Sequence, residues 1–419
     1  MNAPAPAPTT PPISERLVIL LVGAVQFVNV LDFMMVMPLG PDFARALGIP
    51  TSHIGLIGGS YTAAAALAGV LGSLFLDRFD RRVALGCAMV GLVVGTALGG
   101  FATGLGTLLG ARILAGAFGG PATSLSLAIV ADTVPPERRG KALGWVMAAF
   151  SLASVLGVPA GLELGRTLGW RAPFFAVAGL GVLVTAVAVF LMPPLRSHLG
   201  RARAKRNEST PLFDSLSLLS LTNTALVMLG VFSIVPNISA YVQYNLGYPR
   251  EQLGTFYLVG GIASFLVMRL IGVAVDRFGS TPLVIVGTLI HLAALVLGFL
   301  YVKPWIPVLV VFTLFMVSGS VRMVPLQALS TRVPRLEHRA AFMSAQSAVQ
   351  HAASATGAVL ASLVLVAPPT GPLQNIERVA WGAAAVASLV PFFAAAIERR
   401  LKARDLPVPA QAVRATEAV

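Results

Sequence analysis

Long apolar runs alternate with short polar segments along almost all of the 419-residue chain. An α-helix rises about 1.5 Å per residue, so a run of about 20 apolar residues crosses the hydrocarbon core of a bilayer. The pattern predicts twelve membrane-spanning helices, six in each half of the chain. The expected spans are 17–39, 54–76, 83–103, 107–131, 141–165, 173–193, 217–243, 253–275, 281–301, 306–331, 340–366 and 377–397.

The composition agrees with this pattern. Hydrophobic residues make up 56% of the chain, charged residues make up 11%, and the mean hydropathy is +0.82. Such a chain has too little polar surface to cover a water-soluble globule of this size. The single cysteine, Cys87, lies in an apolar run and excludes an intramolecular disulfide or a cysteine-rich metal site. We therefore expect an all-α integral membrane protein.

The net charge of +13 is compatible with a nucleic-acid partner, but the placement of the basic residues points to membrane topology instead. When residues at span ends are assigned to the adjoining loops, 21 of the 30 Lys and Arg residues fall on the side of both termini, 6 fall on the other side, and 3 lie deep within spans. Because basic residues collect in cytoplasmic loops, both termini are expected in the cytoplasm. The chain is predicted to be a multi-pass protein of a bacterial inner membrane with no nucleic-acid partner.

The same pattern divides the chain into five segments. Residues 1–16 are rich in Pro and Ala and are predicted to form a disordered cytoplasmic N-terminus. Two six-helix bundles are expected at 17–193 and 217–397, joined by a basic cytoplasmic linker at 194–216. Residues 398–419 are expected to form a cytoplasmic tail.

A repeated phrase supports the division into halves. Asp77-Arg78-Phe79-Asp80 and Asp276-Arg277-Phe278-Gly279 each follow an apolar span, and their first aspartates are 199 positions apart. Val134-Pro135 and Val333-Pro334 repeat at the same offset. An even number of spans per half implies two parallel repeats related by an axis along the membrane normal. The expected architecture is two parallel six-helix repeats, as in a carrier that works by alternating access.

With these motifs the chain resembles the major facilitator superfamily from the first predicted span through the twelfth. The family's loop pattern G-x-x-x-D-R-x-G-R-R is met at Asp77, Arg78, Arg81 and Arg82. Ser73 and Asp80 stand where the pattern has glycines, whereas the second copy keeps both, Gly272 and Gly279. In the fourth span, Arg112 followed by Gly116 is similar to the family's R-x-x-x-G motif.

The fifth span reads Gly157-Val158-Pro159-Ala160-Gly161. This string departs from the G-P-x-x-G-G antiporter signature and is similar to sugar-efflux and small-molecule exporters related to the drug/proton antiporters. Gly157 and Gly161 belong to a ridge of small residues that permits close helix packing, either static or sliding, and Pro159 predicts a bend.

The resemblance also implies a latch that closes the cytoplasmic side when the carrier faces outward. Its expected members are Asp77, Arg78, Arg81, Arg138, Arg139, Asp276, Arg277 and Gly279. The alternative for these residues is ordinary positive-inside topology with counter-charges.

Asp32 is the most informative single residue, because a carboxylate deep in an apolar helix costs about 2.5–3.5 kcal/mol unless it is protonated, paired or hydrated. Arg112 is expected at a comparable depth and is its natural partner. A carboxyl whose neighbours change between two states can take up and release a proton. We therefore expect proton coupling at Asp32 and Arg112, with Glu163 near the outer end of the fifth span. The alternatives are a static ion pair and, for Glu163, an interfacial pair.

Polar residues at helical spacing on several spans predict a central substrate cavity. The expected cavity residues are Gln26, Asn29, Tyr61, Asn237, Tyr241, Arg322, Gln346, Gln350 and His351. Hydrogen bonding between helices is the alternative for each of them. The second half has no Asp or Glu embedded deep in the membrane to pair with Arg322, so a substrate anion or backbone carbonyls are its expected partners.

The sequence contains no Walker-type phosphate loop, metal-ligand cluster or nucleophile with a placed base. We therefore expect a secondary transporter rather than an enzyme, without cofactor or metal, working as a monomer in the lipid bilayer. Its expected activity is export of small organic molecules or drugs in exchange for protons. A proton symporter or facilitator for uptake of a small metabolite stays open, as does a transport-inactive receptor or scaffold.

Overall fold

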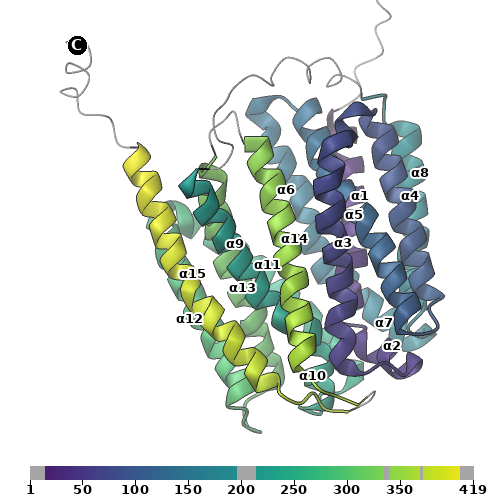
Figure 1. The fold of residues 1–419 in the computed structure, drawn as a ribbon, viewed down its shortest axis with the longest axis vertical. Coiled ribbons are helices and arrows are strands. Elements are labelled where there is room, and N and C mark those ends of the chain that lie inside the picture. Colours follow the sequence, from purple (N-terminus) through teal and green to yellow (C-terminus); the bar gives the residue numbers. More distant parts are fainter. Residues whose placement is uncertain (1–14, 196–213, 335–338, 369–370, 406–419) are drawn as a thin grey trace, which may run out of the picture.

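The computed structural model describes residues 15–195, 214–334, 339–368 and 371–405 (Figure 1). Within these ranges every regular element is a helix, and Val366 and Gln374 form an isolated β-bridge. The helices of the first half are α1 (Glu15–Val36), α2 (Gly40–Leu47), α3 (Ile54–Phe75), α4 (Arg81–Gly100), α5 (Leu105–Thr133), α6 (Pro136–Leu152), α7 (Val158–Leu168) and α8 (Ala172–Leu191). Those of the second half are α9 (Ser215–Ile234), α10 (Ile238–Tyr244), α11 (Leu253–Phe278), α12 (Ser280–Leu295), α13 (Val308–Arg332), α14 (Arg339–Val364) and α15 (Ile376–Asp405).

Six shorter helical segments complete the description. Four are 3₁₀ turns and two are π-helical turns that continue neighbouring helices. They are η1 (Thr51–His53), η2 (Leu76–Arg78), η3 (Ala153–Gly157, π), η4 (Val235–Asn237), η5 (Arg250–Gln252) and η6 (Val296–Leu300, π).

The predicted all-α membrane fold is confirmed. In the described residues, 11 helices are long and apolar enough to cross a membrane. The helix α14 is also long, with 26 residues, but it carries Gln346, Gln350 and His351, which lower its hydropathy. With α14 as the twelfth, the long helices follow the predicted spans closely. The main difference is at α15, which continues past the predicted end at 397 because Leu401 is still fully buried.

The two halves lie side by side, with the helices of the second half on the left of Figure 1 and most of those of the first half on the right. We call the end where Leu195 and Asp214 lie the linker end, and the end where α2 and α10 lie the far end. Helix α14 packs along α3, and glycines permit this approach. A Cβ atom built on Gly55 would lie 2.8 Å from the Ala358 carbonyl oxygen.

The buried apolar residues show where the halves join. The larger cluster runs through the first half and includes residues of the second half near the far end, among them Tyr241, Phe256 and Phe299. A smaller cluster in the second half contains Leu216 and Leu401, which lie near the linker end. The halves therefore share one apolar core toward the far end and have separate cores toward the linker end.

The fifth predicted span is interrupted as Pro159 suggests. Helix α6 passes through the π-helical turn η3 into α7, and Pro159 lies in the first turn of α7, where its missing N–H is tolerated best. The small-residue ridge faces α1, since a Cβ atom on Gly157 would lie 2.5 Å from Leu31 Cδ1 and Gly161 lies beside Met35. The ridge thus packs within the first half.

Candidate functional site

A buried ion pair lies at the centre of the first half. Asp32 of α1 accepts two hydrogen bonds from Arg112 of α5, from Nη1 to Oδ1 at 2.9 Å and from Nη2 to Oδ2 at 3.0 Å. The Asp32 side chain is 0% exposed and that of Arg112 is 1% exposed. Thr96 of α4 donates a third hydrogen bond to Asp32 Oδ1 at 2.7 Å. The carboxylate is thus paired and hydrogen-bonded, as a buried charge requires.

Two predicted cavity residues belong to this cluster instead of a separate cavity wall. Tyr61 of α3 lies under the Arg112 guanidinium, whose Cζ is 4.7 Å from the ring centre, a cation–π contact. The Tyr61 hydroxyl donates to Asn29 Oδ1 at 2.8 Å. Asn29 Nδ2 in turn donates to the Gly119 carbonyl at 2.9 Å and to Thr123 Oγ1 at 2.7 Å. One polar network therefore links α1, α3, α4 and α5.

Glycines of α5 make room for this network. A Cβ atom on Gly116 would lie 2.1 Å from the Tyr61 carbonyl oxygen, and one on Gly119 would lie 2.2 Å from the Tyr61 hydroxyl. In the R-x-x-x-G motif, Arg112 and Gly116 are four residues apart and therefore lie on the same face of α5, one turn after the other. Arg112 forms the ion pair, and Gly116 makes the close contact with α3.

We expect Gly116→Ala to lower the thermal unfolding midpoint of the purified protein, because the added methyl meets backbone that cannot rotate away. Overpacking of this kind costs about 1–3 kcal/mol. Gly110→Ala on the same helix is the matched control, since nothing lies within 4 Å of a Cβ atom there. Equal midpoints for the two variants would contradict the close contact.

Glu163, the third residue predicted for coupling, lies apart from the cluster. It is on the surface of α7, with its side chain 54% exposed, and both of its oxygens accept hydrogen bonds from Arg166. We expect Glu163→Gln to leave the pH dependence of transport unchanged, because the pair is exposed and solvent screens its interaction. A shifted pH profile of transport in that variant would show that Glu163 takes part in proton coupling.

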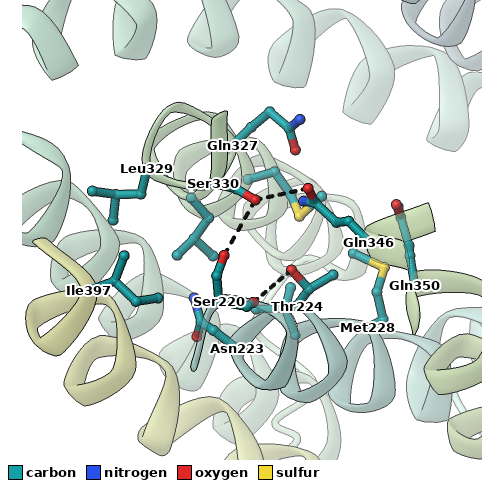
Figure 2. A pocket seen from close by; sticks show the side chains of 13 residues that line it. Ser220, Asn223, Thr224, Met228, Gln327, Leu329, Ser330, Gln346, Gln350 and Ile397 are labelled. Atoms are coloured by element: carbon teal, nitrogen blue, oxygen red, sulfur yellow. Dashed lines mark hydrogen bonds between the residues drawn. The ribbon is translucent and has the colours of Figure 1, made fainter. Parts of the chain in front are cut away.

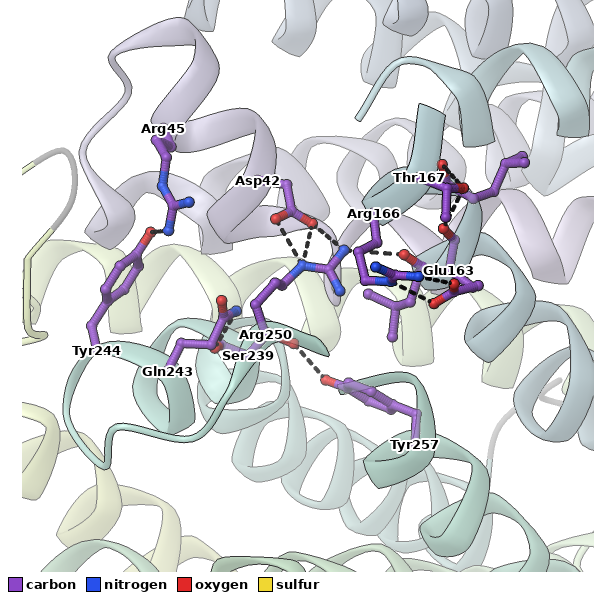
Figure 3. Close-up of polar contacts among 12 residues, drawn as sticks. Asp42, Arg45, Glu163, Arg166, Thr167, Ser239, Gln243, Tyr244, Arg250 and Tyr257 are labelled. Atoms are coloured by element: carbon purple, nitrogen blue, oxygen red, sulfur yellow. Dashed lines mark hydrogen bonds and ion pairs between the residues drawn. The ribbon is translucent and has the colours of Figure 1, made fainter. Parts of the chain in front are cut away.

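A second polar cluster joins the two halves at the far end (Figure 3). Arg250 of η5 binds both oxygens of Asp42 on α2, with Nε at 2.8 Å from Oδ1 and Nη2 at 2.6 Å from Oδ2. Nη2 also donates to the Leu162 carbonyl of α7 at 3.1 Å. The two side chains are only 15% and 17% exposed. Nearby, Arg45 Nη2 donates to the Tyr244 hydroxyl at 3.3 Å.

At the linker end, two of the predicted latch residues form ion pairs within the first half. Arg81 of α4 pairs with Asp132 of α5 at 3.0 Å, and Arg138 of α6 pairs with Glu15 of α1 at 2.8 Å. Arg78 is exposed.

In the second copy of the phrase, Asp276 and Arg277 are exposed, and Arg277 lies 5.3 Å from the Phe278 ring centre. The side chains of Asp77 and Arg139, two further predicted latch residues, lie outside what the structure describes.

The two copies of the repeated phrase cap their helices differently. Asp80 Oδ1 accepts hydrogen bonds from the Arg82 and Leu195 amides, both at 3.0 Å, at the start of α4. At the start of α12, the Thr281 amide donates to Glu398 of α15 at 2.8 Å. Gly279 has a φ of 82° and a ψ of 173°, a conformation that only glycine adopts readily. Each helix start thus has a carboxylate partner.

The second half contains a cavity near its linker end, with about 430 Å³ of space when the adjoining open solvent is included (Figure 2). Its polar wall is a hydrogen-bonded chain in which Ser220 of α9 contacts Ser330 of α13, and Ser330 donates to Gln346 of α14 at 2.9 Å. Asn223 and Gln350 also line it, and Asn223 Oδ1 is buried with no partner among the described residues. The predicted cavity residues Gln346 and Gln350 therefore do line one cavity.

The remaining predicted cavity residues lie elsewhere. Tyr241 packs inside the second half, where its hydroxyl donates to the Gly298 carbonyl at 3.0 Å. Asn237 and Gln26 are buried, and each has a side-chain oxygen without a partner in the described chain. His351 is half-buried and bonds through Nδ1 to the Ser347 carbonyl. Arg322 is buried on α13. The predicted residues therefore occupy several places rather than one wall.

Several residues that take part in these sites were not predicted. Thr96, Asp42 and the cavity residues Ser220, Asn223 and Ser330 carried no motif. Asp42 and Arg250 lie 208 positions apart, so nothing in the chain order pairs them. A threonine in a third helix gives no sign of facing Asp32 unless the helix rotation is known.

Comparisons with known proteins agree with this fold. A model of the Major Facilitator Superfamily matches residues 22–358, with a further match over 220–417. The chain is 25% identical over 256 residues to the uncharacterized MFS-type transporter YtbD of Bacillus subtilis (strain 168), covering 61% of this chain and 60% of YtbD. It is 27% identical over 321 residues to the chloramphenicol resistance protein of Streptomyces lividans, covering 75% of this chain and 79% of that protein. It is also 27% identical over 369 residues to the class C tetracycline resistance protein of Escherichia coli, covering 84% of this chain and 91% of that protein. The match to YtbD thus spans less than two thirds of that relative's length.

Two solved structures share the fold. A bacterial homologue of the human lysosomal transporter Spinster, inward-facing and occupied, aligns with a TM-score of 0.75 at 16% identity, covering 94% of this chain and 99% of that one. The D-xylose-proton symporter aligns with a TM-score of 0.71 at 18% identity, covering 90% of this chain and 96% of the symporter. At these identities the likeness concerns the fold alone. Since the family model matches well over half of its residues, the chain belongs to the Major Facilitator Superfamily and is a membrane transporter, not an enzyme.

Proposed function

We propose that this transporter exports small organic molecules in exchange for protons. The observation that carries the proposal is the fully buried Asp32 carboxylate, bonded to Arg112 and Thr96 within the first half. A membrane carboxylate with this arrangement is a functional-site candidate by default. The resistance proteins among its relatives, named for chloramphenicol and tetracycline, support export and small organic substrates.

Protonation of Asp32 gives the ion pair two states. The ionised carboxylate holds the Arg112 guanidinium through two charge-assisted hydrogen bonds, whereas a protonated one loses its attraction for it. One proton moving down a potential of about 100 mV supplies about 2.3 kcal/mol, roughly a fifty-fold concentration ratio. Proton transfer at this pair is therefore sufficient to drive export.

We further propose that the linker end faces the cytoplasm. The excess of basic residues on the side of the termini supports this orientation. The halves are joined at the far end by Asp42 and Arg250, whereas the pairs at the linker end named above stay within one half. The structure then corresponds to a carrier closed to the outside, with the repeated loops as its cytoplasmic latch in the opposite state.

Uptake by proton symport is the second candidate, because the Gly157-to-Gly161 string departs from the antiporter signature. A transport-inactive receptor or scaffold is a third, although it has no need of a buried Asp32.

Inside-out vesicles with an acidic interior separate these candidates. An antiporter accumulates substrate inside the vesicles and dissipates the pH gradient as it does so. A symporter drives substrate out of the same vesicles, and a scaffold does neither. We expect accumulation of at least one member of a panel of drugs, sugars and organic acids, with loss of the gradient measured by a pH-sensitive dye. Accumulation that is indifferent to the gradient would reject the proposal.

A further inference from the structure

Arg322 is a buried cation with no carboxylate partner among the described residues. Its side chain on α13 is 2% exposed, and its Nε and Nη1 atoms have no hydrogen-bond partner among the described residues. It packs against α12 so closely that a Cβ atom on Gly287 would lie 2.8 Å from Arg322 Cγ. Arg112, the comparable residue of the first half, has a complete carboxylate partner in Asp32. The two halves therefore differ in charge balance.

In the part of the second half that the structure describes, no acidic residue stands in for Asp32. Those that the structure describes lie at or near helix ends: Asp214, Glu251, Asp276, Glu377, Glu398 and Asp405. The nearby His291 is hydrogen-bonded through Nδ1 to Ser318, whose hydroxyl donates to the Phe315 carbonyl. A guanidinium stays protonated in proteins, and a buried charge is normally paired. The described part of the chain thus supplies no counter-charge for Arg322.

The cavity of Figure 2 lies beside the same stretch of α13. Leu326 and Leu329 line it, and they follow Arg322 by four and seven positions on the same face of α13. Gln327, also in its lining, is exposed. Met323, the next residue along α13, also lines the cavity, so the cavity reaches the level of Arg322, although Arg322 itself does not line it.

We propose that the substrate carries an anionic group, such as a carboxylate, and that Arg322 binds this group in the second half. The proposal rests on the transport function proposed above and names the substrate class. The cavity's hydroxyl and amide groups contact the rest of the substrate, and Asp32 with Arg112 handles the proton separately in the first half. A single inorganic anion such as chloride offers the same chemistry, so the test has an arm for it.

The test measures binding by thermal stabilisation of the purified full-length protein. The probes are benzoate, 2-naphthoate and hexanoate, each compared with its neutral amide, and potassium chloride at matched ionic strength. We expect at least one carboxylate to stabilise the protein at a concentration at least ten-fold lower than its amide and than chloride. Binding by amides as strong as by acids, no binding by any acid, or stabilisation by chloride at the same concentration overturns the proposal.

Variants locate the effect. Arg322→Gln is expected to remove the ten-fold preference for acids, and Arg322→Lys, which keeps the charge, to retain part of it. Arg269→Gln is the matched control, because Arg269 is an exposed arginine in the middle of α11 that stacks on Phe265. A preference that survives in Arg322→Gln places the anion elsewhere. Because binding in detergent needs no gradient, a failure of proton coupling leaves this result intact, and the reverse also holds.

Discussion

Asp32→Asn is expected to reduce gradient-driven accumulation from as much as about fifty-fold to none, while exchange of substrate without a gradient continues. The amide keeps the size of the carboxyl group but cannot ionise, so the proton no longer alters its hold on Arg112. The ion pair is 0% and 1% exposed, and breaking such a pair costs about 3–5 kcal/mol of stability. Accumulation and exchange are both measured in vesicles with a labelled substrate, after the folded fraction has been matched by size-exclusion chromatography.

The outcome also distinguishes coupling from a static role for the pair. If the pair only holds α1 and α5 together, Asp32→Asn lowers the unfolding midpoint but leaves the pH profile of the remaining transport unchanged. Glu163→Gln is the matched control, since it removes an acid of the first half that lies on the surface. Gradient-driven accumulation that persists in Asp32→Asn would remove Asp32 from the coupling site.

Asp42→Asn is expected to shift the protein toward a state that is open at the far end. The substitution removes the charge that holds Arg250 of the opposite half through bidentate hydrogen bonds. After allowance for partial exposure, the loss is about 1–2 kcal/mol, or roughly ten-fold in the ratio of open to closed molecules. The measurement is the distance between spin labels at Leu168→Cys and Trp305→Cys, both exposed, in a Cys87→Ser background.

A pair from the same end provides the control for this opening. Glu163 and Arg166 are also at the far end, but both belong to α7, so Glu163→Gln is expected to leave the label distance unchanged. Asp42→Asn combined with Arg250→Gln is expected to open no further than Arg250→Gln alone, because Asp42 acts through Arg250, whereas Arg250 also binds the Leu162 carbonyl. Additive opening would show that each residue holds the far end through different partners.

Much of the fold follows from the sequence because membrane helices are long and their length is fixed by the bilayer. The spans were predictable from apolar runs alone, and the pairing of Asp32 with Arg112 followed from depth and charge. Depth is set by position along a helix. The rotation of a helix about its own axis cannot be read from that position, and this rotation decides which side chains meet. For this reason Tyr61 and Asn29 were assigned to a cavity, whereas they support the ion pair.

Contacts between distant loops could not be predicted from the sequence either, because they depend on how the two halves pack. Asp42 and Arg250 look like ordinary loop charges until the two halves are brought together. Tyr241 has the helical spacing of a cavity residue, but the 3₁₀ turn η4 comes just before α10, and Tyr241 packs inward on Phe299. A local change of helix type is enough to redirect a side chain, and periodicity cannot reveal it.

The different caps of α4 and α12 bear on how the duplicated halves have diverged. The amides of Arg82 and Thr281 are 199 positions apart and meet the same need, but Asp80 lies in the repeated phrase itself and Glu398 lies on the last helix. The phrase of the first half is therefore self-sufficient, whereas that of the second half depends on α15. Grafting the second phrase into the first half would leave the amide of Arg82 without its cap, and the reverse graft would place an aspartate at the φ of 82° now held by Gly279. The two phrases are thus similar in sequence, but neither can replace the other in the structure.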